Sequence, residues 1–316
     1  MKNPKTSIII LNWNTAVDTI ECLESLKKQT EKDFEIILVD NASAPSDIEK
    51  LKFYCEKERQ MGIQLLFNKE NMGFAGGSNA GLKLARGEII ISLNNDTVVT
   101  EDWLENLLIP FKDQSVGASG SKAIYFYERD KKIVQFSGGR VTFYGAAVCD
   151  GQGKPDDNIP SDTVESQWLM GAAFAFRRTI IEKMGEWFCE YFFAYYDEVD
   201  ICWRIRSMGY RVVYCPKSTL YHKGSASVKI NKFSYMQQKL SFRNKYLTFW
   251  RNLPVYKFLV VLPFLCSYDL LRCIKYSVRG EFYFAKSYLE GMIGFVLSLN
   301  KVHRMRLGKL SDLSLK

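Results

Sequence analysis

The chain has 316 residues, 47% of them hydrophobic and 25% charged, proportions that are ordinary for a folded globular protein and exclude a disordered tail. This length suits one large domain with an appendage, or two domains. The charge is unevenly divided, because residues 223–316 hold 17 Lys and Arg against 4 Asp and Glu, a net charge of +13. The total of +8 leaves −5 for residues 1–222, so the two regions face different partners.

Eight cysteines are scattered along the chain without a CxxC pair. Most lie in apolar segments, where a free thiol behaves as a small hydrophobic group, so the pattern favours a reducing compartment and argues against structural zinc. The first ten residues, MKNPKTSIII, run directly into a strand pattern and lack the layout of a signal peptide. We therefore expect the protein in the cytoplasm.

Strand and helix patterns alternate over the first hundred residues. Apolar runs predict strands at residues 7–11, 35–39, 63–67 and 88–93, and helical spacing predicts helices at residues 15–28, 46–61 and 78–85. This alternation predicts an α/β fold with a mostly parallel sheet and helices on both faces.

Each of these strands ends in polar side chains. They are Asn12 and Asn14 after the first strand, Asp40, Asn41 and Ser43 after the second, Asn68 after the third, and Asn94, Asn95 and Asp96 after the fourth. The carboxyl ends of parallel strands form one edge, where ligands bind, so these groups predict a polar site at that edge. For any single strand the alternative is an ordinary turn, because Asn and Asp are common turn residues.

The segment NMGFAGGSN, residues 71–79, follows the third strand. Its three glycines predict a loop that lets the backbone approach a ligand closely before a helix begins. The segment is not GxGxxG and does not follow the first strand, which argues against a dinucleotide-binding dehydrogenase.

The pattern changes after residue 112. In chain order it predicts strands at residues 116–126 and 134–144, a long polar loop at 150–162, a strand at 167–176 leading into a helix that Gly185 ends, a helix from Asp197 to Gly209, and a strand at 211–214. A polar loop of this length inside a domain is usually functional or mobile.

Asp197 and Glu198 follow an aromatic-rich run at residues 192–196. Apolar neighbours raise the pKa of a carboxyl group toward the working range of a general base, so this acidic pair is a candidate for catalysis. The alternative is a helix cap, with Asp200 paired to Arg204 one turn later.

His222 is one of two histidines and follows another strand pattern. A lone histidine is more often structural. If His222 meets Asp96 in space, a carboxylate, an imidazole and phosphate oxygens would together suit a divalent cation.

The basic C-terminal region is rich in Phe, Tyr, Leu and Val, as in VYKFLVVLPFLCSYDLL at residues 255–271. Lys257, Pro263 and Asp269 interrupt this run, which falls short of the roughly 20 apolar residues that span a bilayer. We therefore expect helices that lie in the interface of an anionic membrane, with no nucleic-acid partner. The alternative is that these helices pack on the first domain.

Six motifs in order, IIILNWN, ILVDNAS, NMGFAGGSN, ISLNNDT, WLMGAAFAFRR and YYDEVDICWRIRSMGYRVVY, resemble the family 2 glycosyltransferases, specifically their rhamnosyltransferase-like branch. The resemblance covers roughly residues 5–225. It implies a GT-A fold, in which a Rossmann-like nucleotide-binding sheet is fused to an acceptor-binding half, and the use of a nucleotide-activated sugar with Mg²⁺ or Mn²⁺.

The resemblance also implies roles for individual residues. Those near the nucleotide-sugar would be Asn12, Asn14, Asp40, Asn41, Ser43, Asn71, Gly73, Phe74, Asn79, Asn94 and Asn95. Asp96 and His222 would bind the metal, Trp168 and Gly171 would line the acceptor cleft, and Glu198, with Asp197 beside it, would be the catalytic base. The chain departs from the family's DxD motif at Asn94, which removes one charge from the metal site.

The resemblance implies a domain at 1–225, with a nucleotide-sugar half at 1–112 and an acceptor half at 113–225, and the basic, aromatic composition predicts a membrane-associating helical region at 226–316. The expected activity is inverting transfer of rhamnose from dTDP-rhamnose to a lipid-linked or cell-surface glycan, at the inner face of the cell membrane, as in polysaccharide biosynthesis. The alternatives are a UDP-sugar donor carrying GlcNAc, Gal or Glc, and a non-catalytic nucleotide-sugar-binding protein of the membrane surface. A homodimer is left open.

Overall fold

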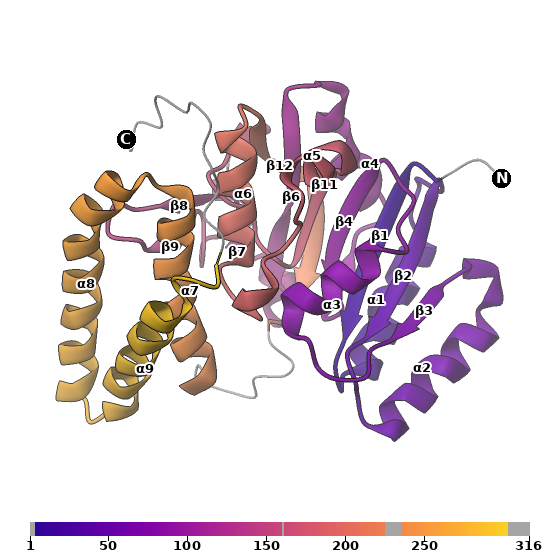
Figure 1. Cartoon of the computed structure of the whole chain (residues 1–316). Helices are drawn as coiled ribbons and strands as arrows, with labels where there is room; N and C mark the ends of the chain where they lie inside the picture. Colours follow the sequence, from indigo (N-terminus) through magenta and orange to yellow (C-terminus); the bar gives the residue numbers. More distant parts are fainter. Residues whose placement is uncertain (1–3, 160, 225–234, 303–316) are drawn as a thin grey trace.

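The computed structural model describes residues 4–159, 161–224 and 235–302, so parts of the predicted region 226–316 lie outside the described residues. A ten-stranded sheet crosses the molecule in the order β10-β12-β6-β11-β4-β1-β2-β3, with β5 paired to β12 and β7 to β6 (Figure 1). Its strands are β1 Thr6–Asn12, β2 Phe34–Asp40, β3 Gln64–Phe67, β4 Ile89–Asn94, β5 Thr97–Val99, β6 Val116–Tyr125, β7 Val134–Phe136, β10 Val164–Glu165, β11 Ala173–Arg177 and β12 Arg211–His222. The strands β8 Gly139–Val141 and β9 Ala147–Cys149 form a separate hairpin.

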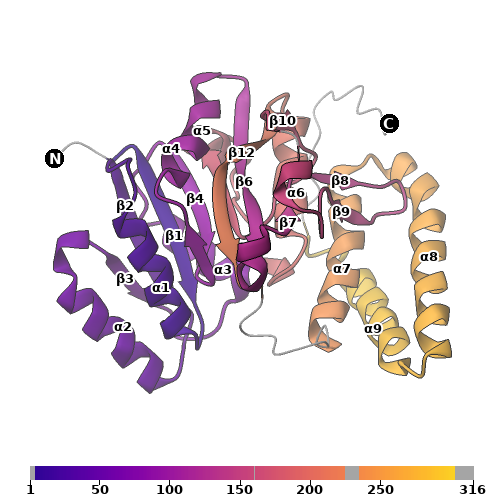
Figure 2. The same cartoon turned by 180° about the vertical axis from the view of Figure 1, so that it is seen from behind.

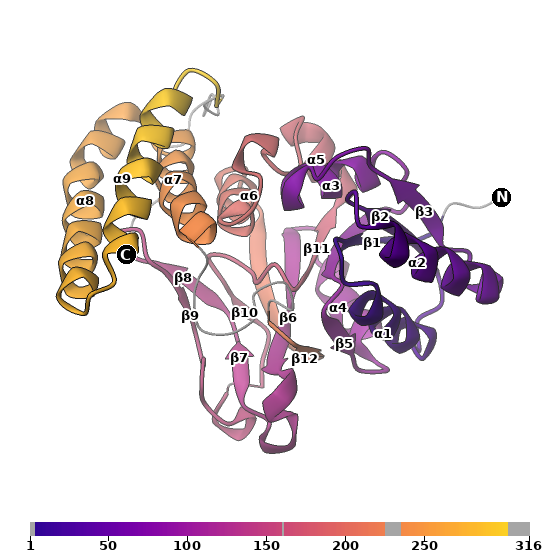
Figure 3. The same ribbon diagram turned by 90° about the horizontal axis from the view of Figure 1, so that it is seen from below.

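Helices cover both faces of the sheet, as the alternating pattern predicts (Figure 3). One face carries α1 Ala16–Lys27, α2 Pro45–Lys57 and α4 Trp103–Leu108, and the other carries α3 Gly73–Leu82, α5 Arg178–Met184 and α6 Asp197–Ser207. Between these layers β1, β2 and β4 are buried on both faces, which is why they read as continuous apolar runs.

Strand ends from residues 1–112 and from residues 113–225 lie at the same edge of the sheet. Because β11 is antiparallel to both β4 and β6, and β12 is parallel to β6, the strands β1, β4, β6 and β12 all point the same way. The carboxyl ends of β1, β2, β4 and β12 therefore share an edge with the start of β11. The helix α6 ends shortly before β12 begins at the opposite edge, so the first residues of α6 lie on the side of the carboxyl ends.

The glycine-rich segment is a helix, and the prediction of a loop there is wrong. Gly73, Gly76 and Gly77 belong to α3, which packs closely on β1 and β2. A Cβ at Gly77 would lie 2.4 Å from Leu11 Cδ1, and one at Gly81 would lie 2.7 Å from Ile9 Cγ2. These glycines serve close helix-to-sheet packing, a demand that local propensity does not reveal.

Three strand predictions are wrong in length. The predicted strand at 134–144 is divided into β7 and β8 at Gly138, whose φ of 111° breaks the extended backbone. The predicted strand at 167–176 begins only at Ala173, and the strand after α6 continues to His222. The short strand β5 directly follows the NND motif and is absent from the prediction, because its partner β12 is remote in sequence.

Three C-terminal helices, α7 Tyr235–Asn252, α8 Val255–Val278 and α9 Phe282–Ser298, form a bundle beside α6. Residues of α7, including Tyr246 and Phe249, share a buried cluster with Phe192 and Trp203 of the first 225 residues. The tip of the β8–β9 hairpin also reaches α8, where Tyr144 and Tyr268 lie 4.6 Å apart between ring centroids (Figure 2). Within the described residues, none of the helices is both long and apolar enough to cross a membrane.

Candidate active site

The ends of β1 and β2 are joined by side-chain hydrogen bonds. Asn12 is fully buried, and its amide donates to Asp40 Oδ1 at 2.8 Å and to Ser43 Oγ at 3.0 Å. Asn14, at a φ of 56°, accepts from the Ala44 N–H at 2.7 Å and donates its own N–H to Ser43 Oγ at 2.9 Å. The residues at these two strand ends that we expect to lie near the nucleotide-sugar therefore form one hydrogen-bonded unit.

Asn41 organises the turn that leads into α3. Its Nδ2 donates to Asn71 Oδ1 at 2.8 Å and to the Gly73 carbonyl at 3.1 Å. Its Oδ1 accepts from Asn68 Nδ2 at 3.0 Å and from the Met72 N–H at 3.1 Å. The third strand end thus joins the other two, which confirms the predicted clustering of polar groups at this edge.

Asn95 points toward α1, because its Nδ2 donates to Thr15 Oγ1 at 2.6 Å and to Thr19 Oγ1 at 2.8 Å. Thr19 in turn donates to Asn12 Oδ1 at 2.8 Å. This partly buried chain of hydrogen bonds joins the NND motif to the end of β1. Sequence reasoning missed Thr15 and Thr19, which carry no signal beyond ordinary helix-start chemistry.

The side chains of Asp96 and His222 lie in contact, which is the condition for the cation site that the sequence suggests. His222 Nε2 lies 3.2 Å from Asp96 Oδ1, and both side chains are largely buried. On the other side of the ring, His222 Nδ1 lies 2.8 Å from Gln135 Oε1. An imidazole that donates Nδ1–H to Gln135 would offer its Nε2 lone pair to a cation beside the Asp96 carboxylate.

These two side chains fit a hard divalent cation that takes its other ligands from a substrate. Mg²⁺ is usually held by one or two carboxylates together with substrate phosphate oxygens and water, so Asp96 supplies the preferred type of ligand and His222 would add an imidazole nitrogen. Within residues 4–159, 161–224 and 235–302, no group of three or more His, Cys, Asp and Glu could hold a metal without such help. The residue at the first DxD position, Asn94, donates its main-chain N–H to the Ala172 carbonyl at 2.8 Å.

The acidic pair follows a strained turn. Three aromatic residues before α6 have positive φ angles: Phe193 at 65°, Tyr195 at 73° and Tyr196 at 66°. Such angles cost non-glycine residues on the order of 1–3 kcal/mol each, and they persist where the surrounding contacts impose them. Strain of this kind, concentrated directly before two candidate catalytic carboxyls, points to a functional site.

Asp197 and Glu198 occupy different environments within the first turn of α6. Asp197 is 1% exposed, and within the described residues neither of its carboxyl oxygens has a hydrogen-bond partner. Burial, followed by repulsion from Glu198 and Asp200, raises the pKa of Asp197 well above its ordinary value. Glu198 keeps partial access to solvent, and burial raises the pKa of its carboxyl group to about 7.

Asp200 is the structural acid of this helix. It forms the predicted pair with Arg204 at 2.8 Å, and it accepts from Asn252 Nδ2 of α7 at 2.8 Å. Although burial alone would raise the pKa of Asp200, the guanidinium groups of Arg251 and Arg204 and the Asn252 hydrogen bond lower it. Three neighbouring acids therefore have three different states, which sequence spacing could not reveal.

The remaining predicted residues lie around these centres. Phe74 packs on Phe188 with 5.2 Å between ring centroids, and Asn79 bonds the backbone of Phe188 through both its amide nitrogen and its oxygen. Trp168 is 5% exposed, and its indole N–H donates to the Arg140 carbonyl at 3.2 Å, so it supports the β8–β9 hairpin. Gly171 precedes β11, and a Cβ there would meet nothing closer than 3.8 Å.

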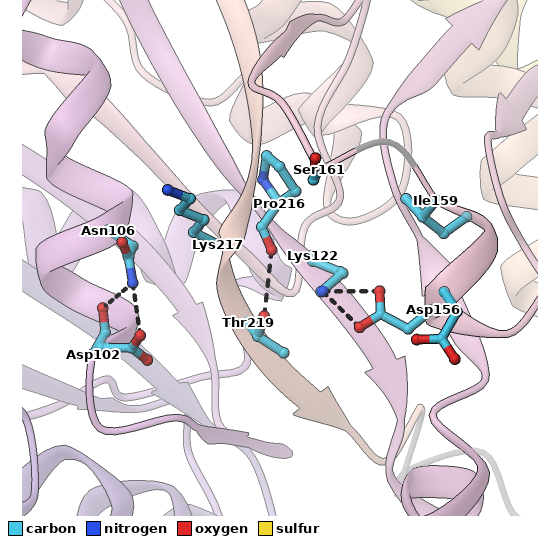
Figure 4. Close-up of a pocket in the computed structure, with 10 residues that line it drawn as sticks. Asp102, Asn106, Lys122, Asp156, Ile159, Ser161, Pro216, Lys217 and Thr219 are labelled. Carbon is cyan, nitrogen blue, oxygen red and sulfur yellow. Dashed lines mark hydrogen bonds and ion pairs between the residues drawn. The ribbon is translucent and has the colours of Figure 1, made fainter.

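A polar pocket of about 500 Å³ lies elsewhere, between α4, β6 and β12 (Figure 4). Lys122 Nζ contacts Asp156 at 2.8 Å and Asn106 donates to Asp102 at 2.9 Å, so three of its charged side chains already have polar partners within the pocket. None of the predicted site residues lines it. We therefore assign the chemistry to the carboxyl-end edge.

Comparison with known proteins agrees with this architecture. Residues 7–185 match the family model Glycosyl transferase family 2. The chain is 30% identical over 115 residues to the putative glycosyltransferase EpsH of Bacillus subtilis, covering 36% of this chain and 33% of EpsH. It is 29% identical over 234 residues to the O-antigen biosynthesis protein RfbC of Myxococcus xanthus, covering 71% of this chain and 18% of RfbC. The chain thus spans a third or less of the length of these curated relatives.

Solved structures resemble the whole chain. The mannosyltransferase PcManGT from Pyrobaculum calidifontis, in complex with GDP-Man and Mn²⁺, superposes with a TM-score of 0.59 at 16% identity, covering 94% of this chain and 88% of that one. Residues 1–349 of S. aureus TarS, in complex with UDP-GlcNAc, superpose with a TM-score of 0.62 at 15% identity, covering 93% and 81%. These likenesses show the GT-A fold. With more than half of its residues matched by the family model, the chain belongs to glycosyl transferase family 2.

Proposed function

We propose that this protein is an inverting glycosyltransferase that moves a sugar from a nucleotide-sugar to a glycan acceptor, with Glu198 as the catalytic base. One observation carries the proposal: the polar ends of β1, β2 and β4, the Asp96–His222 pair and the start of α6 lie along a single edge of the sheet. The donor would lie against residues 1–112 and the acceptor against residues 113–225.

The environment of Glu198 suits a general base. A base works best when its pKa lies near the operating pH, and the Glu198 carboxyl has a pKa of about 7. Glu198 would accept the proton of an acceptor hydroxyl while that oxygen attacks the anomeric carbon and the nucleoside diphosphate departs. Asp197 is too deeply buried for an acceptor to reach, which supports Glu198 as the base.

Asp96 and His222 would hold Mg²⁺ or Mn²⁺ at the diphosphate. A cation there supplies charge neutralisation for the leaving group. The solved neighbour PcManGT is in complex with GDP-Man and Mn²⁺, which supports a divalent metal here. Within the chain itself, the role of Asn12, Asp40, Asn41 and their partners would be to shape the nucleotide pocket.

The best donor candidate is dTDP-rhamnose, with a lipid-linked or cell-surface glycan as acceptor. The relative RfbC is named for O-antigen biosynthesis, which supports a polysaccharide acceptor. A UDP-sugar is the second candidate, supported by the TarS complex with UDP-GlcNAc.

The experiment is thermal stabilisation of the purified chain by dTDP-rhamnose, UDP-GlcNAc, UDP-glucose, UDP-galactose and GDP-mannose, each with and without Mn²⁺. A ligand that binds only the folded state raises the melting temperature once its concentration exceeds its dissociation constant. We expect a metal-dependent shift with one nucleotide class. A folded protein that responds to none of the five would refute a nucleotide-sugar enzyme and leave a scaffold role.

We further propose that α8 and α9 bind an anionic membrane surface. The outward face of α8 exposes Val255, Tyr256, Leu259, Val260, Phe264, Leu270, Leu271, Ile274 and Val278, and α9 adds Phe282, Leu289, Ile293, Val296 and Leu297. On α8 these residues recur at helical spacing opposite the buried Phe258, Leu265 and Cys273. A continuous apolar stripe along a 24-residue helix, about 36 Å long, exceeds what single surface hydrophobics explain.

The charges around this face favour binding to a lipid surface over binding to a protein partner. Along α8, the exposed charge is basic, at Lys275, and the acid Asp269 is buried in an ion pair with Lys245. Arg279 and Lys286 are exposed beside the stripe. The two acids of this region, Glu281 and Glu290, are half-buried, and Glu290 pairs with Lys239. An apolar face bordered by exposed basic residues is typical of helices that lie in the headgroup region of anionic bilayers. We therefore propose a peripheral location on the inner face of the cell membrane.

A further inference from the structure

The strained turn before α6 is contacted from outside the first 225 residues by a buried amide of α7. Asn244 is fully buried, and its Nδ2 donates to the carbonyls of Phe192 at 3.0 Å, Ala194 at 2.8 Å and Tyr195 at 2.8 Å. The two N–H bonds of this amide are thus shared among three carbonyl oxygens. Tyr195 has a positive φ angle, and Phe192 and Ala194 flank Phe193, whose φ angle is also positive.

Arg243 fixes the orientation of that amide. Its Nε donates to Asn244 Oδ1 at 2.9 Å, which turns Nδ2 toward the loop. Its Nη2 donates to the carbonyls of Tyr191 and Phe192, both at 2.9 Å. Two consecutive residues of α7 therefore bind four consecutive or near-consecutive carbonyls of residues 191–195.

The opposite side of the turn is held by the donor half. The Phe193 carbonyl accepts from the Ala75 N–H, in the first turn of α3, at 3.2 Å. Gly73 permits this approach, because a Cβ there would lie 2.3 Å from the Phe193 oxygen. The turn therefore lies between the glycine-rich helix and α7, which both bind it, and Glu198, the second residue of α6, follows Tyr195 by three residues.

We infer that Asn244 is a positioning residue for the base: by holding the backbone of residues 192–195 it fixes where α6 begins and where the Glu198 carboxyl enters the site. The inference rests on the proposed function, in which Glu198 is the base. It makes α7 a part of the catalytic machinery as well as a packing element, because the strained φ angles cannot persist without the contacts that impose them.

Asn244 affects the base through geometry and hydration. The titratable groups that face Glu198 are Asp197 and Cys202 on its own helix, Tyr195 and Tyr196 on the preceding turn, and Cys149 on β9. None of these is on α7. If the turn relaxes, the Glu198 carboxyl gains water and its pKa moves from about 7 toward the ordinary value of 4.5.

The test compares Asn244→Leu, which has similar volume but no N–H donor, with Lys239→Gln as the matched control. Lys239 lies on the same helix and pairs with Glu290 at 2.9 Å, away from the turn. Hydrogen exchange of the full-length chain reports the turn directly and needs no substrate. Turnover is followed as nucleoside diphosphate release from dTDP-rhamnose or UDP-GlcNAc, whichever stabilises the wild-type protein, over pH 5–9.

For Asn244→Leu we expect faster exchange confined to residues 190–202, a kcat lower by roughly 10- to 100-fold with the donor KM within about twofold, and an acid limb moved to lower pH by about one unit or more. Lys239→Gln should leave all three unchanged. The inference is overturned if Asn244→Leu leaves exchange of the turn unaltered, or if the turn loosens while kcat and the pH profile match the control.

Two further variants separate the possible failures. If Asn244→Leu does not fold, Arg243→Lys keeps the charge but loses the paired donation to Tyr191 and Phe192, and it should show the same effects at smaller size. Glu198→Gln tests the base itself. Wild-type turnover by Glu198→Gln would refute the proposed function, whereas an inactive Glu198→Gln with a control-like Asn244→Leu would refute only the positioning role.

Discussion

Asp96 and His222 are remote in sequence, yet their side chains lie 3.2 Å apart because β5, the strand directly after Asp96, pairs with the end of β12. The pairing of Thr97 with His222 sets this approach. The proposed metal site thus forms where the segment after β4 meets β12. It also depends on Gln135, whose side chain orients the His222 imidazole.

Replacing Gln135 by Leu should weaken the metal-dependent part of donor binding by about 10- to 100-fold. Gln135 fixes the orientation of His222, and partners of this type tune the affinity of a metal ligand. The measurement is a Mn²⁺ titration of the thermal shift given by the best nucleotide-sugar. Gln152→Leu, at an exposed glutamine that bonds Tyr125, is the control and should bind like the wild type. Equal Mn²⁺ affinity in both variants would contradict the site.

Turnover should rise with pH through about 7. The carboxylate of Glu198 is the active form, and burial raises its pKa to about 7, so about half of it is ionised at that pH and the ionised fraction falls as the pH is lowered. Glu198→Gln should lower kcat by about 100-fold or more and remove this acid limb, with donor binding retained. A wild-type profile whose acid limb instead lies near pH 4.5 would show that Glu198 is not the group that titrates.

Asp197→Asn and Asp200→Asn should change stability in opposite directions. The folded-state pKa of Asp197 is raised, so the wild-type protein loses stability as pH rises above about 4, by at most about 1.4 kcal/mol per pH unit until the raised pKa is reached. The melting temperature of Asp197→Asn should therefore rise relative to wild type as pH increases.

Asp200 has a lowered pKa, so its stabilising contribution is present above pH 4 and is lost as pH falls through the lowered value. Asp200→Asn leaves the buried Arg204 without its carboxylate partner and Arg251 paired with Glu186, and it should cost about 3–5 kcal/mol at pH 7, less in acid. Thermal unfolding of both variants from pH 4 to 8 checks the pair. Parallel pH trends would show that the two carboxyls do not differ as described.

Gly81→Ala should destabilise the chain by about 1–3 kcal/mol, since its Cβ would press on Ile9 Cγ2 at 2.7 Å and Val39 Cγ2 at 2.9 Å in a packed layer. Gly171→Ala meets ordinary space and should leave the melting temperature unchanged. A loss of transfer in Gly171→Ala at full stability would support the predicted acceptor contact. Equal stability of the two variants would contradict the close packing of α3.

Replacing Leu271 and Ile274 by Glu should lower binding of the full chain to vesicles rich in phosphatidylglycerol by more than about tenfold, because the change removes apolar contact and adds negative charge at the surface. Co-sedimentation measures this, with phosphatidylcholine vesicles to isolate the charge contribution. Phe53→Glu, at an exposed aromatic on α2, is the control. If the wild-type chain binds neither vesicle type but forms dimers that the Leu271 and Ile274 changes disrupt, the apolar face is instead an interface with a second copy of the chain.

Much of the first half could be predicted from sequence. The strands ending at Asn12, Asp40 and Asn94 are continuous apolar runs because they are buried on both faces, and their period is visible locally. The clustering of their polar ends follows from parallel pairing alone. Local sequence patterns fail where non-local contacts decide, as in the glycine-rich segment, which forms a helix so close to the sheet that a Cβ at Gly77 would meet Leu11.

The sequence by itself determined the family, the α/β class and the residue types of the site, because these depend on local periodicity and on motifs that are continuous in the chain. Tertiary structure alone decided the state of each acid. Asp197, Glu198 and Asp200 are near neighbours in sequence, yet one is buried without partners, one reaches solvent and one is paired with two arginines. Their pKa values depend on burial and on charges brought by α7 and other remote elements, and no local pattern encodes that arrangement.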